Sequence, residues 1–345
     1  MKVEKMKVNK FISCIFFLFL INNIVIAKEL SPQELLKQVY INSSKVSYTA
    51  ISETKIFKPK LFITKARIYN KLQKNKIEYF SKPLNGTYLI DDGVKLIRFN
   101  PYKKIIFISN SEFNNNQEDL NLLLNNFNIK IQGEEEILNR KVYILTISSK
   151  YIGRNYKKIW VDKEKYIILK SELYNYNNEL ISSNVFSMVN FNAQINNDLF
   201  IPKFIQRNFK IIETNIDEKY NKTEIEKIIG FDIIEPNYIP AGFKKQGYYL
   251  QKRPYKDVGY IQYFDGLNSI SIFQIKCIDS DYSDNRGYIG GYNKHKRRYG
   301  RKHCFGRFNN ENQIVINTNK GKIRIIVVSD ISEEEIEKII SSFVF

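Results

Sequence analysis

Between Val46 and about Ile212, short runs of β-branched and aromatic residues alternate with turn signals such as Asn85-Gly86 and Asn100-Pro101. This pattern is typical of strands joined by tight connections. The sharpest hairpin signal covers residues 88–99, where Asp92-Gly93 accommodates the positive φ angles of a type I′ turn. The sequence therefore predicts a long antiparallel meander.

Helical periodicity interrupts or flanks these strands. Residues 31–34 (Ser-Pro-Gln-Glu) form a capping box with proline at the first helical position, ahead of an apolar stripe. A leucine-rich segment at 114–128 predicts a helix or lid between strands. Residues 223–226 form a second capping box, and Ser332 with Glu335 caps a closing helix whose apolar face comprises Ile336, Ile339, Ile340 and Phe343.

A polar stretch at residues 213–222 predicts a linker between two domains. The first domain, residues 28–212, contains the meander. The second, residues 223–345, has the pattern of a smaller α+β domain with strands near 247–250, 258–264, 269–277, 313–317 and 322–328. The predicted fold class is thus α+β and rich in β structure.

The N-terminus has the pattern of a secretory signal peptide. Lysines precede an apolar run from Phe11 that continues to Ala27. We expect cleavage after Ala27, export to the periplasm and a soluble mature protein. A retained anchor is the alternative, because residues 11–27 approach the length of a membrane span. Cys14 opens the apolar region, so we expect it to be discarded with the signal.

The chain is basic, with a formal net charge of +18 at pH 7. Such a surplus favours an anionic partner, and export makes nucleic acid the least expected one. A compositional drift toward AT-rich codons explains part of the charge equally well. One segment, residues 286–302, contains no acidic residue. It is either a docking loop, for an acidic protein or an anionic membrane surface, or a tolerated insertion. Its basic residues include Lys294, Lys296, Arg297, Arg298 and Arg301.

The mature chain offers few groups for catalysis. Its histidines and cysteines are His295, His303, Cys277 and Cys304. In an exported protein a disulfide between the two cysteines is favoured over a zinc site, since adjacent His303 and Cys304 lack the usual ligand spacing. None of the common nucleophile, metalloprotease, phosphate-loop or dinucleotide motifs is present. We therefore expect a binding protein without cofactor, metal or catalytic residue.

Several short motifs resemble those of RseB/MucB and LolA-like envelope proteins. In the first domain these are Tyr156–Asp162, followed by Leu169-Lys170-Ser171-Glu172, and residues 89–101 with their Asp-Gly turn. In the second domain, residues 239–243 and 264–267 are similar to passages of the RseB-type C-terminal domain, which LolA-type carriers lack.

The resemblance implies a LolA-like incomplete antiparallel β-barrel that encloses helices and accepts acyl chains. It also implies a periplasmic lipid or lipoprotein sensor that holds a membrane-bound anti-sigma factor and regulates envelope-stress signalling. A LolA-like carrier and a structural envelope protein are the alternatives. Alternation along the strand points to Ile159, Val161 and, on the next strand, Ile168 as residues of the cavity wall.

Overall fold

The computed structural model describes residues 30–58, 60–111, 116–202, 208–213, 220–251, 257–276, 306–308, 311–318 and 321–343; for residue 116 and residues 306–318 it describes the backbone alone. The proposed signal peptide, residues 1–27, lies outside them. Among the described residues, no helix is long and apolar enough to cross a membrane.

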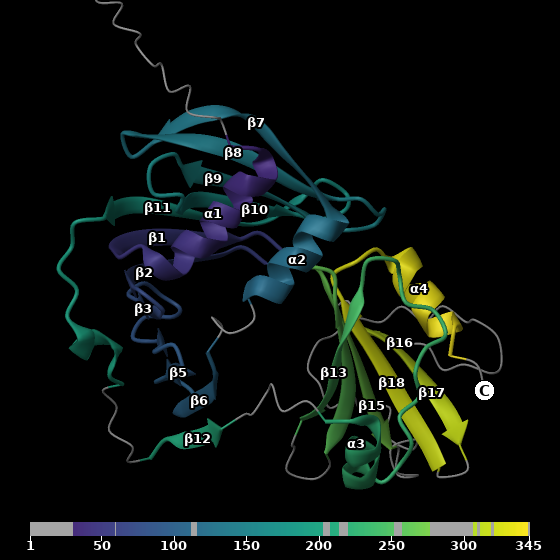
Figure 1. The fold of residues 1–345 in the computed structure, drawn as a ribbon. Coiled ribbons are helices and arrows are strands. Elements are labelled where there is room, and N and C mark those ends of the chain that lie inside the picture. The colour runs from purple at the N-terminus through teal and green to yellow at the C-terminus, as the bar shows by residue number, and fades with distance from the viewer. Residues whose placement is uncertain are drawn as a thin grey trace, which may run out of the picture. The chain divides into compact units, whose positions relative to one another are not determined.

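The strands from Tyr48 to Glu213 form one twelve-stranded sheet, in the order β12-β6-β5-β4-β3-β2-β1-β11-β10-β9-β8-β7 (Figure 1). Neighbouring strands are antiparallel except β12, which runs parallel to β6. The strands are β1 (Tyr48–Ile56), β2 (Phe62–Lys71), β3 (Lys74–Tyr79), β4 (Tyr88–Asp91), β5 (Lys95–Asn100), β6 (Ile105–Asn110), β7 (Phe127–Ile137), β8 (Arg140–Ser149), β9 (Tyr156–Asp162), β10 (Ile168–Tyr174), β11 (Leu180–Asn190) and β12 (Lys210–Glu213), with a short 3-10 helix, η2 (Asn197–Phe200), before β12.

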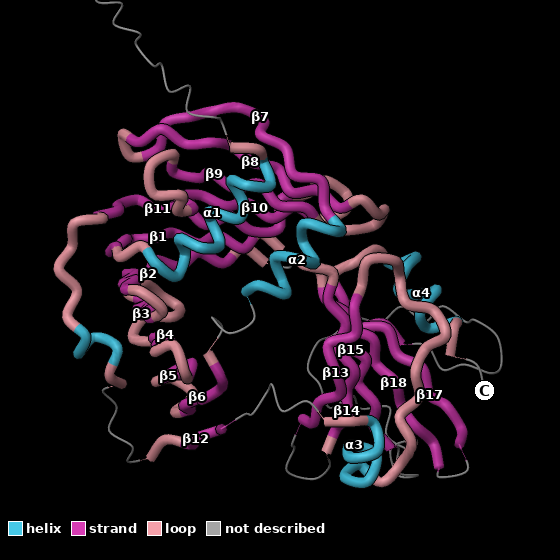
Figure 2. The backbone as a smooth tube through the Cα atoms, in the orientation of Figure 1, coloured by secondary structure: helices cyan, strands magenta, loops and turns pink. Residues whose placement is uncertain are grey.

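Two helices lie against this sheet, as the tube view shows (Figure 2). Helix α1 (Pro32–Lys45) contacts β2, β7 and α2 (Asn116–Asn126), and α2 contacts β7. The predicted capping box at the start of α1 is present. Glu34 N–H donates to Ser31 Oγ at 3.2 Å, and Ser31 N–H donates to the Glu34 carboxylate at 2.8 Å. The α1 side chains buried by this packing are Leu35, Leu36 and Val39.

A second, six-stranded sheet has the order β13-β14-β15-β18-β17-β16, with all pairs antiparallel. Its strands are β13 (Lys244–Gln251), β14 (Val258–Phe264), β15 (Ser269–Lys276), β16 (Gly306–Phe308), β17 (Glu311–Thr318) and β18 (Gly321–Ser329). The helices α3 (Lys222–Ile229) and α4 (Glu333–Ser341) pack their apolar sides into its core, which contains Ile225, Ile261, Ile272, Ile325, Ile336 and Ile339.

Three local predictions were wrong. Helix α3 is capped by Asn221 with Glu224, two residues before the predicted box at 223–226, because the Asn221 side chain accepts the Glu224 N–H at 2.9 Å. Ser332 is the N-cap of α4 but makes no side-chain cap bond, since Glu335 instead accepts from Tyr238 and Lys338. The turn at residues 92–93 is not type I′, which needs two positive φ angles, because only Gly93 has one. The Asp92 carboxylate instead accepts the N–H groups of Val94 and Lys95.

The fold prediction is confirmed at the level of a β-rich protein with few helices and a large open sheet. The incomplete barrel that encloses helices stays a prediction. The same holds for the domain limits at 28–212, 213–222 and 223–345. Residues from Ser31 onward form a single compact unit by their contacts.

Candidate functional site

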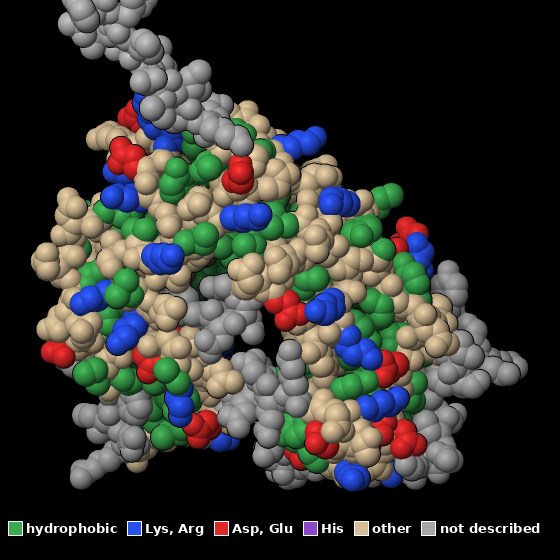
Figure 3. All heavy atoms as spheres, viewed as in Figure 1, with side chains coloured by type: hydrophobic (Ala, Val, Ile, Leu, Met, Phe, Trp, Pro, Cys, Tyr) green, Lys and Arg blue, Asp and Glu red, His purple; other side chains and the backbone are tan. Residues whose placement is uncertain are grey.

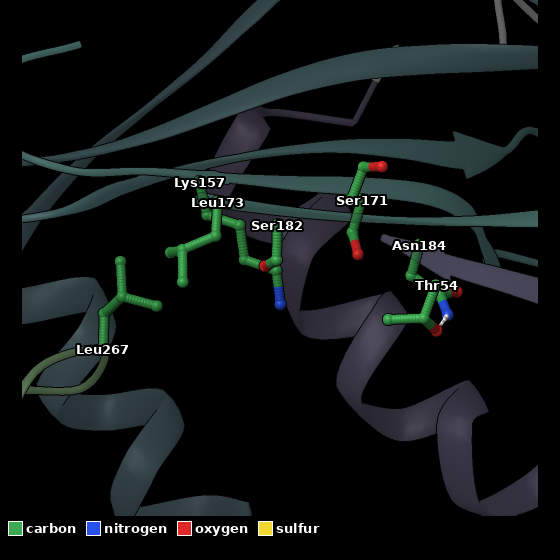
Figure 4. Close-up of a pocket in the computed structure, with 8 residues that line it drawn as sticks. Thr54, Lys157, Ser171, Leu173, Ser182, Asn184 and Leu267 are labelled. Atoms are coloured by element: carbon green, nitrogen blue, oxygen red, sulfur yellow. Dashed lines mark hydrogen bonds between the residues drawn. The ribbon is translucent and has the colours of Figure 1, made fainter. Parts of the chain in front are cut away.

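A pocket of about 190 Å³ lies on the face of the twelve-stranded sheet that α1 and α2 cover (Figure 4). Strands β1, β11, β10 and β9, which are neighbours in the sheet, carry all but one of its lining residues. The turn between β14 and β15 supplies the remaining one. The lining residues are Thr54, Lys157, Ser171, Leu173, Ser182, Ser183, Asn184 and Leu267.

Strand register explains why these side chains meet. Residues paired across antiparallel strands point to the same face of a sheet. Two such rows cross the sheet here. One is Ile56, Ser182, Leu173, Lys157 and Ile147, and the other is Thr54, Asn184, Ser171, Ile159 and Leu145. The pocket therefore occupies the centre of two neighbouring rows.

The centre of these rows is polar, whereas their β8 ends are apolar and buried at Ile147 and Leu145. The Asn184 amide donates to Thr54 Oγ1 at 2.6 Å, shown as a dashed line in Figure 4. No acidic side chain lines the pocket. The structure thus places hydroxyl, amide and ammonium groups where a sheet facing helices would ordinarily carry apolar residues.

Lys157 is the single charged residue among those that line the pocket. Its ammonium forms no ion pair or hydrogen bond with any residue that the structure describes. Burial lowers the pKa of Lys157 from its usual value, because a charged ammonium loses hydration there without gaining a partner. Lys157 is partly exposed, and an ammonium that faces no carboxylate in the pocket lining is a candidate contact for an anionic ligand.

The predicted cavity residues lie on the same face as Lys157 but outside the pocket lining. Ile159 and Val161 alternate with Lys157 along β9, and Ile168 pairs with Val161 across β10. Ile159 and Val161 are fully buried, while Ile168 is partly exposed. That acyl chains touch these three residues stays a prediction. Lys157 was missed, although the same alternation places it two residues before Ile159.

The turn that carries Leu267 into the pocket is held by a buried carboxylate. Asp265 accepts the N–H groups of Leu267 and Asn268 at 2.9 and 2.7 Å, and the Asn268 amide at 3.0 Å. Gly266 has a φ of +110°, and a Cβ at this position would lie 2.5 Å from the Leu123 nitrogen. The turn is thus fixed by its own hydrogen bonds and by close contact with α2.

Asp265 also faces Arg154, which precedes β9. Arg154 Nε and Asp265 Oδ2 are 3.6 Å apart, and the two side chains are 1% and 0% exposed. Burial lowers the pKa of Arg154, and the Asp265 carboxylate opposes that shift. The guanidinium stacks on Phe243, with 4.8 Å from Cζ to the ring centroid. We call Arg154, Asp265 and Asn268 the buried polar cluster.

Two further contacts join the same elements. The Asn126 amide donates to the carbonyls of Gly242 and Asp265, each at 2.8 Å. Ser332 N–H donates to the Gly153 carbonyl at 2.9 Å. The start of β9, the end of α2 and the second sheet are therefore connected directly beside the pocket.

The remaining predicted sites lie outside the described residues. These are the disulfide Cys277–Cys304, the alternative zinc ligands His295 and His303, and the basic loop with Lys294, Lys296, Arg297, Arg298 and Arg301. Over the described surface, Lys and Arg side chains lie scattered among acidic and apolar ones in the view of Figure 3.

The fold of this chain is similar to solved structures of known proteins. The chain is similar to MucB in the complex structure of Pseudomonas aeruginosa MucA/MucB, with 12% identity, a TM-score of 0.60, and coverage of 89% of this chain and 96% of that chain. It is also similar to MucB in complex with MucA(peri), at 13% identity and TM-score 0.60, and to a crystal structure of MucB, at 12% and 0.53. At these identities the likeness defines the fold. No curated protein sequence matches.

Part of the sequence also matches a protein-family model. Residues 94–204 match the model of the MucB/RseB N-terminal domain. This region runs from β5 to the residues after η2 and includes Lys157 with the rest of β9. This match and the MucB-like fold bear out the predicted resemblance to RseB/MucB-type proteins.

Proposed function

We propose that the protein regulates a sigma-factor pathway from the periplasm by holding a membrane-bound anti-sigma factor, and that an acyl ligand in the pocket weakens that hold. The observation that carries the regulatory part is the likeness to MucB along nearly its whole length, in complexes whose partner is MucA. Both sheets take part in the likeness, which favours the regulator over a LolA-like carrier.

The pocket and the buried polar cluster support the sensing part. A volume of about 190 Å³ is smaller than the roughly 300–1,000 Å³ of typical ligand pockets. A long acyl chain therefore cannot lie wholly inside the pocket. Leu267 is the lining residue that does not belong to the sheet carrying the rest of the pocket, and its turn is bonded to α2 and faces Arg154.

Ligand entry would thus act on the second sheet through the Leu267 turn. A ligand shifts such an equilibrium only as far as it prefers the open arrangement over the closed one. Leu267 is partly exposed, whereas separating Asp265 from Arg154 would break a buried ion pair, which is costly. We expect the Leu267 side chain to move while the backbone of its turn and the buried polar cluster keep their contacts.

A binding measurement tests the regulatory part. The purified protein is immobilised and titrated with the periplasmic segment of a membrane-bound anti-sigma factor from the same organism. We expect saturable binding that a fatty acid weakens. Absence of binding to every such segment, together with transfer of acylated protein between vesicles, would support the carrier instead.

A further inference from the structure

The pocket is built to receive a negative charge. Its lining includes one cation, Lys157, and no acid. The hydroxyls of Ser171 and Ser182 line the same pocket and make no side-chain hydrogen bond with the described residues. Three donors therefore converge on a space that offers them no acceptor of matching charge.

The position of Lys157 makes a purely structural role costly. The residue stands in the row between Leu173 and Ile147, so an apolar side chain would match its neighbours. Burial also lowers its pKa, since the ammonium has lost water without a compensating carboxylate. Lys158, its neighbour on the other face, has by contrast the Tyr174 ring 5.5 Å from its ammonium.

The rows also define a path for an attached chain. Beyond Ser182 the Lys157 row continues to Ile56 and then to Phe62 on β2. Ile56 is 37% exposed, and Phe62 is partly exposed. An apolar strip therefore leads from the pocket to the β1–β2 hairpin. The space inside the pocket is too small for a whole acyl chain, but the strip lies outside it.

We propose that Lys157 binds the carboxylate of a fatty-acid-type ligand, with Ser171 and Ser182 as hydroxyl donors and the acyl chain lying along the Leu173–Ile56 row. This assignment rests on the proposed acyl-sensing function and names the ligand class of that site. A carboxylate matches one ammonium and two hydroxyls within about 190 Å³ better than a bulkier phosphodiester headgroup does.

The test compares a fluorescent polyene fatty acid with its methyl ester, which has the same chain and no charge. A charge-assisted hydrogen bond predicts that the wild-type protein prefers the acid by about tenfold or more. Lys157→Met removes the charge and keeps an unbranched apolar side chain. In this variant the acid and the ester should bind with equal affinity. Lys158→Met is the matched control and should keep the preference.

A second variant examines the chain path. Ile56→Ser should weaken binding of a long-chain acid and leave octanoate unchanged, because only the long chain reaches the hairpin. The residue is partly exposed, so folding should tolerate the change.

The outcomes separate the two proposals. If the wild-type protein binds neither acid nor ester, the acyl-sensing function itself fails. If it binds both equally, or if Lys157→Met keeps the tenfold preference, the carboxylate site is refuted while acyl binding stands. Tighter binding of an acyl phosphate than of the acid in the wild-type protein also overturns the carboxylate assignment.

Discussion

Replacing Asp265 should strongly destabilise the protein, because this fully buried carboxylate has two sets of partners. It accepts three hydrogen bonds within the Leu267 turn and is the facing charge for Arg154. Asp265→Ala would leave the turn without its acceptor and would remove the carboxylate that pairs with the buried Arg154 guanidinium, whose other acidic neighbours are Glu335 and Asp330.

The magnitude follows from the charge left behind. Breaking a buried ion pair by removing one partner costs about 3–5 kcal/mol. The free energy of unfolding of a folded domain is about 5–15 kcal/mol, so the variant should still fold but with a much smaller free energy of unfolding. The double variant Asp265→Ala, Arg154→Met removes both charges, while methionine still packs on Phe243. It should recover a good part of the loss.

Urea unfolding followed by fluorescence measures these free energies, since Trp160 is the single tryptophan. Glu334→Ala is the control, because its partner Lys338 is also exposed and such pairs contribute about 0–1 kcal/mol. The reasoning is refuted if Asp265→Ala costs no more than the control. It is also refuted if the double variant is less stable than Asp265→Ala alone.

Three further predictions concern the same elements. Gly266→Ala should lower the free energy of unfolding by about 3 kcal/mol or more, because alanine has a strained φ there and its Cβ clashes with the Leu123 backbone. Gly230→Ala, where φ is also positive but the space is open, should cost about 1–2 kcal/mol. Equal losses of the two variants in urea unfolding would contradict the packing argument. Burial raises the pKa of the Asp330 carboxyl, so its negative charge destabilises the fold at neutral pH. Asp330→Asn should therefore gain stability over the wild-type protein at pH 7 and lose that gain below about pH 4. A stability difference that does not change with pH would contradict this prediction. Burial lowers the pKa of Lys157, so without ligand Lys157→Met should be more stable than the wild-type protein at pH 7. In thermal melts this gain in stability should shrink as the pH approaches about 10.4, where lysine in the unfolded chain loses its proton. A gain that does not change with pH would show that only packing changed.

The large elements could be predicted because each depends on local pattern. The α1 capping box is specified by four consecutive residues, and β14 begins and ends where apolar alternation does, at Val258 and Phe264. The predicted caps of α3 and α4 were wrong for a different reason. Asn221 caps the helix two residues earlier than predicted, and Glu335 accepts a hydrogen bond from Tyr238, which is distant in sequence.

The site was only half predictable. Period-two alternation along β9 puts residues 157, 159 and 161 on one face, so Lys157 was within reach of the same reasoning that selected Ile159. What the sequence lacks is the register of β9 against β10 and β11, which brings Ser171 and Ser182 beside it. The contact of Leu267 with the pocket joins residues more than eighty positions apart, and no local pattern encodes it.

The central claim is that acyl ligand and anti-sigma factor bind to one protein with opposing effects. Its most direct test is the dissociation constant of the anti-sigma periplasmic segment, measured without ligand and with a saturating long-chain fatty acid. The account predicts weaker binding of the segment with the acid. By linkage, the segment must weaken binding of the acid by the same factor. An unchanged dissociation constant under saturation, with the acid bound, would contradict the account.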